Sequence, residues 1–284
     1  MRLAQDFFEH EYRLDYYLHQ YRKPIVVWGS GIIMGGGIGL MVGASHRIVT
    51  ETSRLAMPEI TIGLFPDVGA SWFLNQMPEW AGLFLGLTGA QFGAADALYL
   101  GLADFGVPSE TKAVLLNALA EVNWEDDRAL HRQQISVVIG AFEVDELKQD
   151  ALLVTHQKAI QGMMDKSTLV EIVRAVEDRV ADDPWLQQAR STLLAGSPTT
   201  ACLVYEQLCR GRKQTLLQTF QMELIMAVQC AARPDFSEGV RALLVDKDGQ
   251  PNWRYTSVDA VPQEWVQAHF QSPWPEGEHP LQNL

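Results

Sequence analysis

A run of glycines and two acidic residues that follow prolines could together carry out acyl or enolate chemistry. The run is Gly-Gly-Gly-Ile-Gly at residues 35–39, Glu59 follows Met57-Pro58, and Asp67 follows Phe65-Pro66. Because glycine has no Cβ, a ligand can approach its amide closely, and the amides at a helix start have no partner within the helix. Such amides stabilise an oxyanion. A carboxylate beside them can take a proton from water.

The glycine run by itself is compatible with three interpretations. A nucleotide-binding P-loop needs a Lys-Ser/Thr pair after its glycines, and the sequence has none there. A dinucleotide fingerprint is loosely matched by Gly37, Gly39 and Gly43 with Glu59 as its acid, but Met57-Pro58 is unlike the end of a ribose-binding strand. The third interpretation is close helix packing without any ligand. The glycines alone do not choose among the three.

Each acid also has a purely structural explanation. Glu59 could be an ordinary first-turn acid behind the proline at position 58, where the helix dipole favours negative charge. Asp67 lies in a Pro-Asp-x-Gly sequence that is common in turns. Gly63 and Pro66 argue against one straight helix from 59 to 67. We therefore expect a fold-back that could point both acids into one pocket.

The elements that should position these residues alternate short strands with helices, which favours an α/β layer. Apolar residues at a helical period predict the first helix, and short β-branched runs next to glycine predict buried strands. We expect a helix at 3–22, a strand at 25–28, a buried helix at 35–43, strands at 47–50 and 54–57, and helices at 80–87 and 93–99.

After residue 109 the sequence carries almost no strand signal, and the apolar residues recur at a helical period. Asp183-Pro184 and Ser197-Pro198 each place a capping residue before a proline, as at the start of a helix. Asp235 and Glu238 have capping-box spacing. From residue 249, proline and tryptophan recur without a period. We predict three regions: an α/β core at 1–109, a helical region at 110–248 and an irregular tail at 249–284.

The composition limits the kinds of partner. The chain has 284 residues and a formal net charge of −13, which argues against nucleic-acid binding because that depends on Lys and Arg at phosphates. Three cysteines without a CxxC give no disulfide framework and suit reduced thiols in the cytoplasm. The seven histidines lack metal-ligand spacing, so we expect no metal. Neither a signal peptide nor an uninterrupted membrane-spanning run is visible, so we expect no membrane partner.

Taken together, the motifs closely resemble the crotonase (enoyl-CoA hydratase/isomerase) superfamily and, within it, the 3-hydroxyisobutyryl-CoA hydrolase branch. The resemblance runs from about residue 7 to 270. The glycine run is typical of the superfamily, whereas the paired acids and the block at residues 235–242 are specific to the branch. The matching stretches are Lys23-Pro24, Met34-Gly35-Gly36-Gly37, Ala56-Met57-Pro58-Glu59, residues 63–69, Leu87-Thr88-Gly89, Gly196-Ser197-Pro198-Thr199, Asp235-Phe236-Ser237-Glu238-Gly239-Val240-Arg241-Ala242 and Asp246-Lys247-Asp248.

The resemblance implies roles for four residues. Gly36 would donate its amide to the thioester oxygen, and Glu59 would be the catalytic carboxylate that activates water or attacks the carbonyl. Asp67 would be the second acid, which distinguishes the hydrolases from the hydratases. Glu11 would contact the substrate, although it could also be an ordinary helix acid. Position 39, where hydratases usually carry a second glutamate, is glycine here, so hydrolysis is favoured over hydration.

The same resemblance implies a fold, a substrate and an N-terminal extent of the family. It implies a partial crotonase-like (ββα spiral) core at 1–109 and a mostly helical C-terminal half. Family members continue upstream of the residue that matches Met1, so we expect an N-terminally incomplete core that lacks its first strands and has impaired activity. The substrate would be a short branched 3-hydroxyacyl-CoA of valine catabolism, with coenzyme A as part of the substrate and no separate cofactor. An enoyl-CoA hydratase/isomerase, a non-catalytic acyl-CoA-binding remnant and a homo-oligomer stay open.

Overall fold

The computed structural model describes residues 2–179 and 183–284. The chain divides into two compact units. The first unit comprises Met1–Tyr16, Ala56–Ala90 and Gln157–Leu284, and the second comprises Tyr17–Leu55 and Gln91–His156. Within the described residues, no helix is both long enough and apolar enough to cross a membrane.

The second unit is built on a small parallel sheet. Its strands are β1 (Val26–Gly29), β3 (His46–Val49) and β5 (Phe105–Gly106), in the order β1-β3-β5. A separate pair joins β2 (Ile32–Met34) to β4 (Arg54–Ala56). The remaining elements of this unit are helical: α2 (Gly36–Val42), α5 (Ala94–Tyr99), η3 (Ser109–Thr111), α6 (Lys112–Ala120), η4 (Arg128–Leu130), α7 (His131–Gly140), η5 (Asp145–Lys148) and α8 (Leu152–Thr155).

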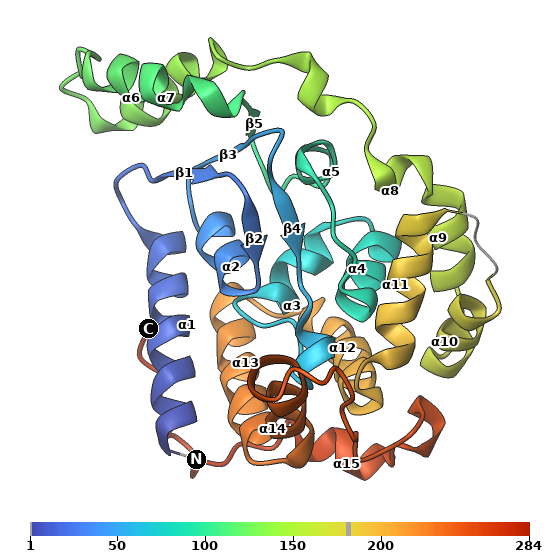
Figure 1. Ribbon diagram of the computed structural model, residues 1–284. Coiled ribbons are helices and arrows are strands. Elements are labelled where there is room, and N and C mark those ends of the chain that lie inside the picture. Colours follow the sequence, from blue (N-terminus) through green and yellow to red (C-terminus); the bar gives the residue numbers. More distant parts are fainter. Residues whose placement is uncertain (1, 180–182) are drawn as a thin grey trace. The chain divides into compact units, whose positions relative to one another are not determined.

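The apolar core of this unit lies between the parallel sheet and the helices α6 and α7. Ile48 of β3 is fully buried there with Leu115 of α6 and Ile139 of α7. In Figure 1 these two helices are the green pair next to the sheet strands. The apolar sequence Val-Val-Trp-Gly of β1 and the Ile-Val end of β3 fit this position, because a parallel strand is covered on its faces.

The first unit is almost entirely helical. Its elements are α1 (Arg2–Gln20, through Tyr16), η1 (Glu59–Ile62), α3 (Ala70–Phe73), η2 (Leu74–Gln76), α4 (Glu79–Thr88), α9 (Gln157–Met164), α10 (Leu169–Glu177), α11 (Pro184–Ala195), α12 (Pro198–Gly211), α13 (Leu216–Ala231), α14 (Pro234–Val240), η6 (Arg241–Val245), η7 (Val258–Ala260) and α15 (Gln263–Ala268).

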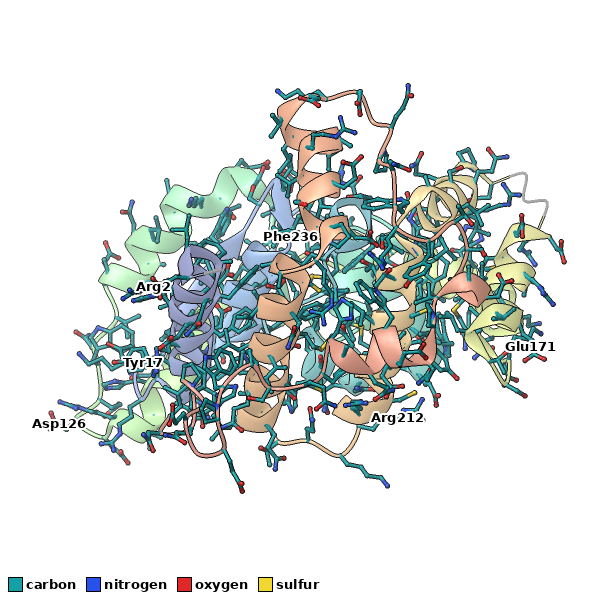
Figure 2. All side chains as sticks on the ribbon, turned by 90° about the horizontal axis from the view of Figure 1, so that it is seen from below. Arg2, Tyr17, Asp126, Glu171, Arg212 and Phe236 are labelled. Atoms are coloured by element: carbon teal, nitrogen blue, oxygen red, sulfur yellow. The ribbon has the colours of Figure 1, made fainter. Side chains whose placement is uncertain are left out.

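Helix α4 is central to the first unit, because it packs against α9, α11 and α12 (Figure 1). Helix α13 packs on α3 and α14. Phe236 of α14, labelled in Figure 2, has its ring centre 6.4 Å from that of Phe8 on α1. The buried core here is aromatic and aliphatic, with Phe65, Phe84 and Phe220 all nearly inaccessible.

Most of the expected elements are confirmed, including the first helix, three of the strands and the proline-led helices. Asp183 and Ser197 both cap helices: Asp183 accepts from the amides of Trp185 and Leu186, and Ser197 accepts from that of Thr200. The capping box at Asp235 is wrong, since α14 begins one residue earlier at Pro234. Strand β2 was not predicted, because three residues inside a glycine-rich stretch carry too little pattern.

Asp235 is drawn into a different set of hydrogen bonds. Its Oδ2 accepts from the hydroxyl of Ser197 at 2.8 Å, and its Oδ1 accepts from the amide of Arg254 at 2.9 Å. It therefore ties α14 to the start of α12 and to the following tail. That tail, expected to be irregular, includes the short helix α15.

Candidate active site

Glu59 stands at the first position of the short helix η1, directly after Pro58. The helix ends after one turn at Gly63, whose φ of 69° lies in the left-handed region. A Cβ at Gly63 would come within 2.4 Å of the carbonyl oxygen of Asp235, so only glycine fits this turn. The Glu59 side chain is buried, and its Oε2 has no hydrogen-bond partner among the described residues.

Asp67 lies on a tight turn between Pro66 and the first residue of α3. The next two residues, Val68 and Gly69, both have positive φ angles, of 52° and 88°. A positive φ at a β-branched residue is strained, and such strain persists only where surrounding contacts fix the backbone. The fold-back that the glycine and proline of this segment suggested is therefore present, and it leaves Asp67 buried.

Three buried side chains fix this turn. Gln207 of α12 donates from Nε2 to the carbonyl oxygen of Pro66 at 2.8 Å. Glu223 of α13 accepts from the amides of Gly69 and Ser71 at 2.7 and 2.8 Å. Tyr12 of α1 donates its hydroxyl proton to Oδ2 of Asp67 at 2.8 Å.

Helix α1 also carries two acids whose charges act on Asp67 or are acted on by it. Glu11 and Asp15 are four residues apart and so share one side of the helix. Asp15 is only 1% exposed, and its Oδ2 has no hydrogen-bond partner among the described residues. Burial, together with the charges of Glu11, Asp67 and Glu223, raises the pKa of Asp15 to about 8.

The electrostatics of this cluster, which we call the acid cluster, favour proton uptake. Burial raises the pKa of Glu59 well above its ordinary value, and the nearby charges of Asp67 and Glu11 raise it further. Burial and the charge of Glu11 raise the pKa of Asp67 to about 7, although the hydrogen bond from Tyr12 opposes this. Buried acids with strongly shifted pKa values are typical of functional sites. The acid cluster consists of Glu11, Asp15, Glu59, Asp67 and Glu223.

Three of the four residues singled out from the sequence, Glu11, Glu59 and Asp67, thus belong to one interacting group in the first unit. Gly36 belongs to the second unit, where it begins α2. Gly35 before it has φ 51° and ψ −121°, a conformation open to glycine alone. As the first residue of the helix, Gly36 has an amide without an intrahelical acceptor.

Sequence reasoning missed Tyr12, Asp15 and Glu223. A signal existed for Glu223, which is a single acid within the otherwise apolar stretch Met-Glu-Leu-Ile-Met-Ala-Val of residues 222–228. An acid at such a position is rarely buried without a partner. For Tyr12 the signal was weak, because a tyrosine next to Phe8 on an amphipathic helix usually only packs.

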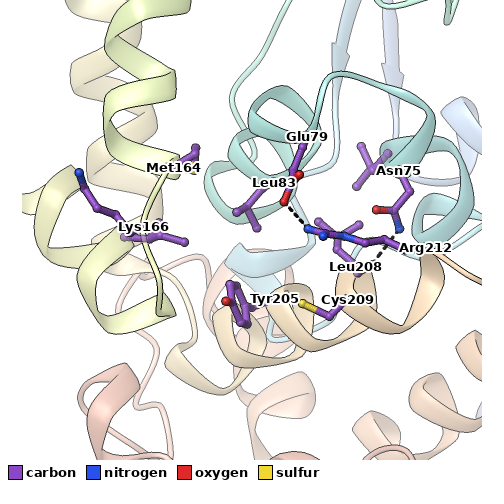
Figure 3. Close-up of a pocket in the computed structure, with 11 residues that line it drawn as sticks. Asn75, Glu79, Leu83, Met164, Lys166, Tyr205, Leu208, Cys209 and Arg212 are labelled. Atoms are coloured by element: carbon purple, nitrogen blue, oxygen red, sulfur yellow. Dashed lines mark hydrogen bonds and ion pairs between the residues drawn. The ribbon is translucent and has the colours of Figure 1, made fainter.

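A separate hollow of about 70 Å³ lies between α4, α12 and the segment that follows α9 (Figure 3). Figure 3 shows Lys166, Tyr205, Cys209 and Arg212 on its walls. Arg212 is already paired with Glu79 across the hollow. No residue of the acid cluster lines this hollow, so the candidate site is placed at the acids instead.

Comparison with known proteins identifies the family. Residues 1–270 match the family model described as enoyl-CoA hydratase/isomerase. The chain belongs to this family. Its α/β fold with a helical C-terminal half also agrees with an enoyl-CoA hydratase structure from Rhodobacter sphaeroides, at a TM-score of 0.81 and 33% identity over 96% of this chain and 75% of that one.

Two similar proteins have names that describe different roles, one an enzyme and the other a ribosomal subunit protein. The mitochondrial 3-hydroxyisobutyryl-CoA hydrolase of Xenopus tropicalis is 32% identical over 95% of this chain and 69% of its own length. The small ribosomal subunit protein mS47 of Neurospora crassa is 34% identical over 92% of this chain and 54% of its own length. The family and the hydrolase relatives together support an enzyme that acts on CoA esters.

Proposed function

We propose that this protein hydrolyses a short, branched 3-hydroxyacyl-CoA thioester, with 3-hydroxyisobutyryl-CoA of valine catabolism as the substrate. The observation that carries the proposal is the buried pair Glu59 and Asp67, whose charges interact and whose pKa values are both raised. The hydrolase relative from Xenopus tropicalis supports the same reaction. Two acids held in one buried group suit a reaction that moves a proton from water to a leaving thiolate.

The proposed steps use the acids in different roles. Glu59 either takes a proton from water, which then attacks the carbonyl carbon, or attacks that carbon itself to form an anhydride that water opens. In both cases the C–S bond breaks, and the thiolate of coenzyme A takes up a proton. Asp67 orients the 3-hydroxyl of the substrate, and Glu11 contacts the substrate. The Gly36 amide is the proposed donor to the oxyanion.

Hydration of an enoyl-CoA is the nearest alternative within the family, and the name of the Rhodobacter sphaeroides protein corresponds to it. That reaction uses a pair of carboxylates to add water across a double bond. Position 39, at which the resemblance places the second of those carboxylates, is glycine in this chain. We therefore prefer hydrolysis.

A non-catalytic protein is the second candidate, because the Neurospora crassa relative is named as a ribosomal subunit protein. On that alternative the chain would bind acyl-CoA without turning it over, or serve as a binding partner. The grouping of buried acids whose pKa values are raised favours catalysis, because such groups are typical of functional sites and are costly to bury in a purely structural one.

The other proposals concern cofactors, partners and compartment. Coenzyme A enters as part of the substrate, and we propose no separate cofactor. A homo-oligomer stays a prediction, as does a cytoplasmic location, which the mitochondrial name of one relative leaves undecided.

A thiol-release assay tests the function. Purified protein should release free thiol from 3-hydroxyisobutyryl-CoA, and Glu59→Gln should abolish that release. Glu264→Gln, an exposed acid on α15, is the matched control and should keep the parent rate. Loss of enoyl absorbance without thiol release would instead support hydration, and binding of acyl-CoA without either reaction would support the non-catalytic alternative. Activity of Glu59→Gln within about threefold of the parent would contradict the role of Glu59.

A further inference from the structure

The hydroxyl of Tyr12 is bound directly to an acid of the proposed site. It donates to Oδ2 of Asp67 at 2.8 Å, and both residues are buried. A carboxylate has two oxygens that can each accept hydrogen bonds. The hydrogen bond from Tyr12 therefore engages Oδ2 of Asp67, whereas Oδ1 receives no bond from Tyr12.

The ring of Tyr12 is held rigidly, so its hydroxyl has a fixed position. The side chain is fully inaccessible to solvent. Its ring centre lies 5.8 Å from that of Phe8 and 5.9 Å from that of Phe220, in the range of favourable aromatic contacts. A tyrosine side chain has only two main torsions, and these contacts restrict both.

A phenol suits this position because it remains a donor. Burial raises the pKa of Tyr12 well above its ordinary value, and the charges of Asp67 and Glu223 raise it further. Tyr12 therefore keeps its proton at neutral pH. It can stabilise a carboxylate without adding a charge to a cluster that already contains several acids.

We propose that Tyr12 is a positioning residue for the hydrolysis: its hydroxyl holds Oδ2 of Asp67 and leaves Oδ1 as the oxygen that meets the substrate. The inference rests on the proposed function, since it concerns how Asp67 is presented. It adds to that function the residue that fixes the rotamer of Asp67. The backbone of Asp67 is fixed separately, by Gln207 and Glu223 on either side of it.

The groups that act on Asp67 come from each element packed around it. Three of these titratable side chains are on helix α1, one is on η1, and two are on α13. Tyr12 is the group among them whose hydrogen bond lowers the pKa of Asp67. The titratable groups that interact with Asp67 are Glu11, Tyr12, Asp15, Glu59, Glu223 and Cys230.

Tyr12→Phe tests the inference, because it removes the hydroxyl and keeps the ring. We expect kcat for thiol release to fall about tenfold, the loss typical of a hydrogen bond to a charged group. The acidic limb of the pH–rate profile should also move to higher pH, because Asp67 loses the donor that favours its ionised form. A purely structural role for Tyr12 would change the rate without moving this limb.

Tyr16→Phe is the matched control. Its ring also packs on Phe220, with 6.1 Å between the ring centres, and its hydroxyl makes no hydrogen bond within residues 2–179 and 183–284. This variant should keep both the parent rate and the parent pH profile. In the Asp67→Asn background, Tyr12→Phe should have little further effect on rate, because the two residues act as one unit.

Two outcomes separate this inference from the proposed function. If the parent releases no thiol, the function fails, and the inference is then tested by NMR titration of the Asp67 carboxyl, which should show a higher pKa in Tyr12→Phe. If the parent is active but Tyr12→Phe keeps its rate and its acidic limb, the inference is overturned and the function stands. If Tyr12→Phe does not fold, the same titration is made with 3-fluorotyrosine at position 12, which keeps the ring and donates a stronger hydrogen bond. The Asp67 pKa should then fall, and an unchanged Asp67 pKa overturns the inference.

Discussion

Oε2 of Glu223 accepts the amide hydrogen of Gly69 at 2.7 Å, although the two residues are 154 positions apart in the sequence. The other oxygen, Oε1, accepts from the amide of Ser71 at 2.8 Å. These amides begin α3, where a helix has no acceptors of its own. A buried acid from α13 therefore replaces a local cap, and it holds the turn that carries Asp67.

Replacing Glu223 should loosen this turn. In Glu223→Gln one oxygen becomes an amide nitrogen, which cannot accept, so one buried amide loses its partner. We expect the free energy of unfolding to fall by about 1–3 kcal/mol, the cost of an unsatisfied buried group. Urea denaturation with Glu264→Gln as the exposed control measures it. Equal unfolding midpoints for the two variants would mean that the turn does not depend on Glu223.

Asp67→Asn and Glu59→Gln should differ in which substrates they affect. If Asp67 orients the 3-hydroxyl, the loss should be about tenfold greater for 3-hydroxyisobutyryl-CoA than for isobutyryl-CoA, which lacks that group. Glu59→Gln should affect both substrates alike, because water attack needs Glu59 in each case. The measurement is thiol release at matched substrate concentrations. An equal loss on the two substrates for Asp67→Asn would contradict the orienting role.

The sequence allowed the elements near the site to be predicted because their signals are local. The helical period places α1, the glycines and the apolar run place α2, and proline with a capping residue places α11 and α12. Gly63 and Pro66 also indicated the fold-back between Glu59 and Asp67. These features depend on residues that are close together in the chain.

What the sequence could not supply are contacts between distant segments. The bond from Tyr12 to Asp67 joins residues 55 apart, and nothing in either local sequence requires it. The capping-box pattern at Asp235 failed for the same reason, since Ser197, 38 residues away, takes one oxygen of that side chain. A buried polar side chain bonds to whichever group in the fold completes its hydrogen bonds, and that group can come from a distant segment. A local sequence pattern cannot reveal such a partner.

The free energy of unfolding of Asp15→Asn should increase relative to that of the parent as the pH rises. The pKa of Asp15 is raised from 3.8 to about 8 in the folded state, so between these values the folded chain holds a proton that the unfolded chain has lost. Stability linked to this group therefore falls as pH rises through that window. Asparagine does not titrate. Its advantage over the parent should grow by on the order of 1 kcal/mol per pH unit.

Urea denaturation at about pH 5 and about pH 7.5 measures this dependence. Asp6→Asn, an exposed acid on the same helix, is the control and should give the same difference from the parent at both pH values. A pH-independent difference between Asp15→Asn and the parent would show that Asp15 is not held in its neutral form.

Gly63→Ala should damage the site through the backbone. The residue has a φ of 69°, and a Cβ there would lie 2.4 Å from the carbonyl oxygen of Asp235. Gly101→Ala is the matched control, because Gly101 has a φ of 70° and nothing within 4 Å of the added atom. The control should lose only the cost of placing a residue with a Cβ in the left-handed region, about 1–2 kcal/mol.

Gly63→Ala should lose at least about 2 kcal/mol more than Gly101→Ala, because α14 or η1 must move to admit the methyl group. Urea denaturation of the two variants gives the difference directly. Since η1 begins at Glu59 and ends at Gly63, that movement should also lower thiol release, whereas Gly101→Ala should leave it unchanged. If both variants lose the same stability, the close approach to Asp235 does not constrain this turn, and the placement of Glu59 depends on other contacts.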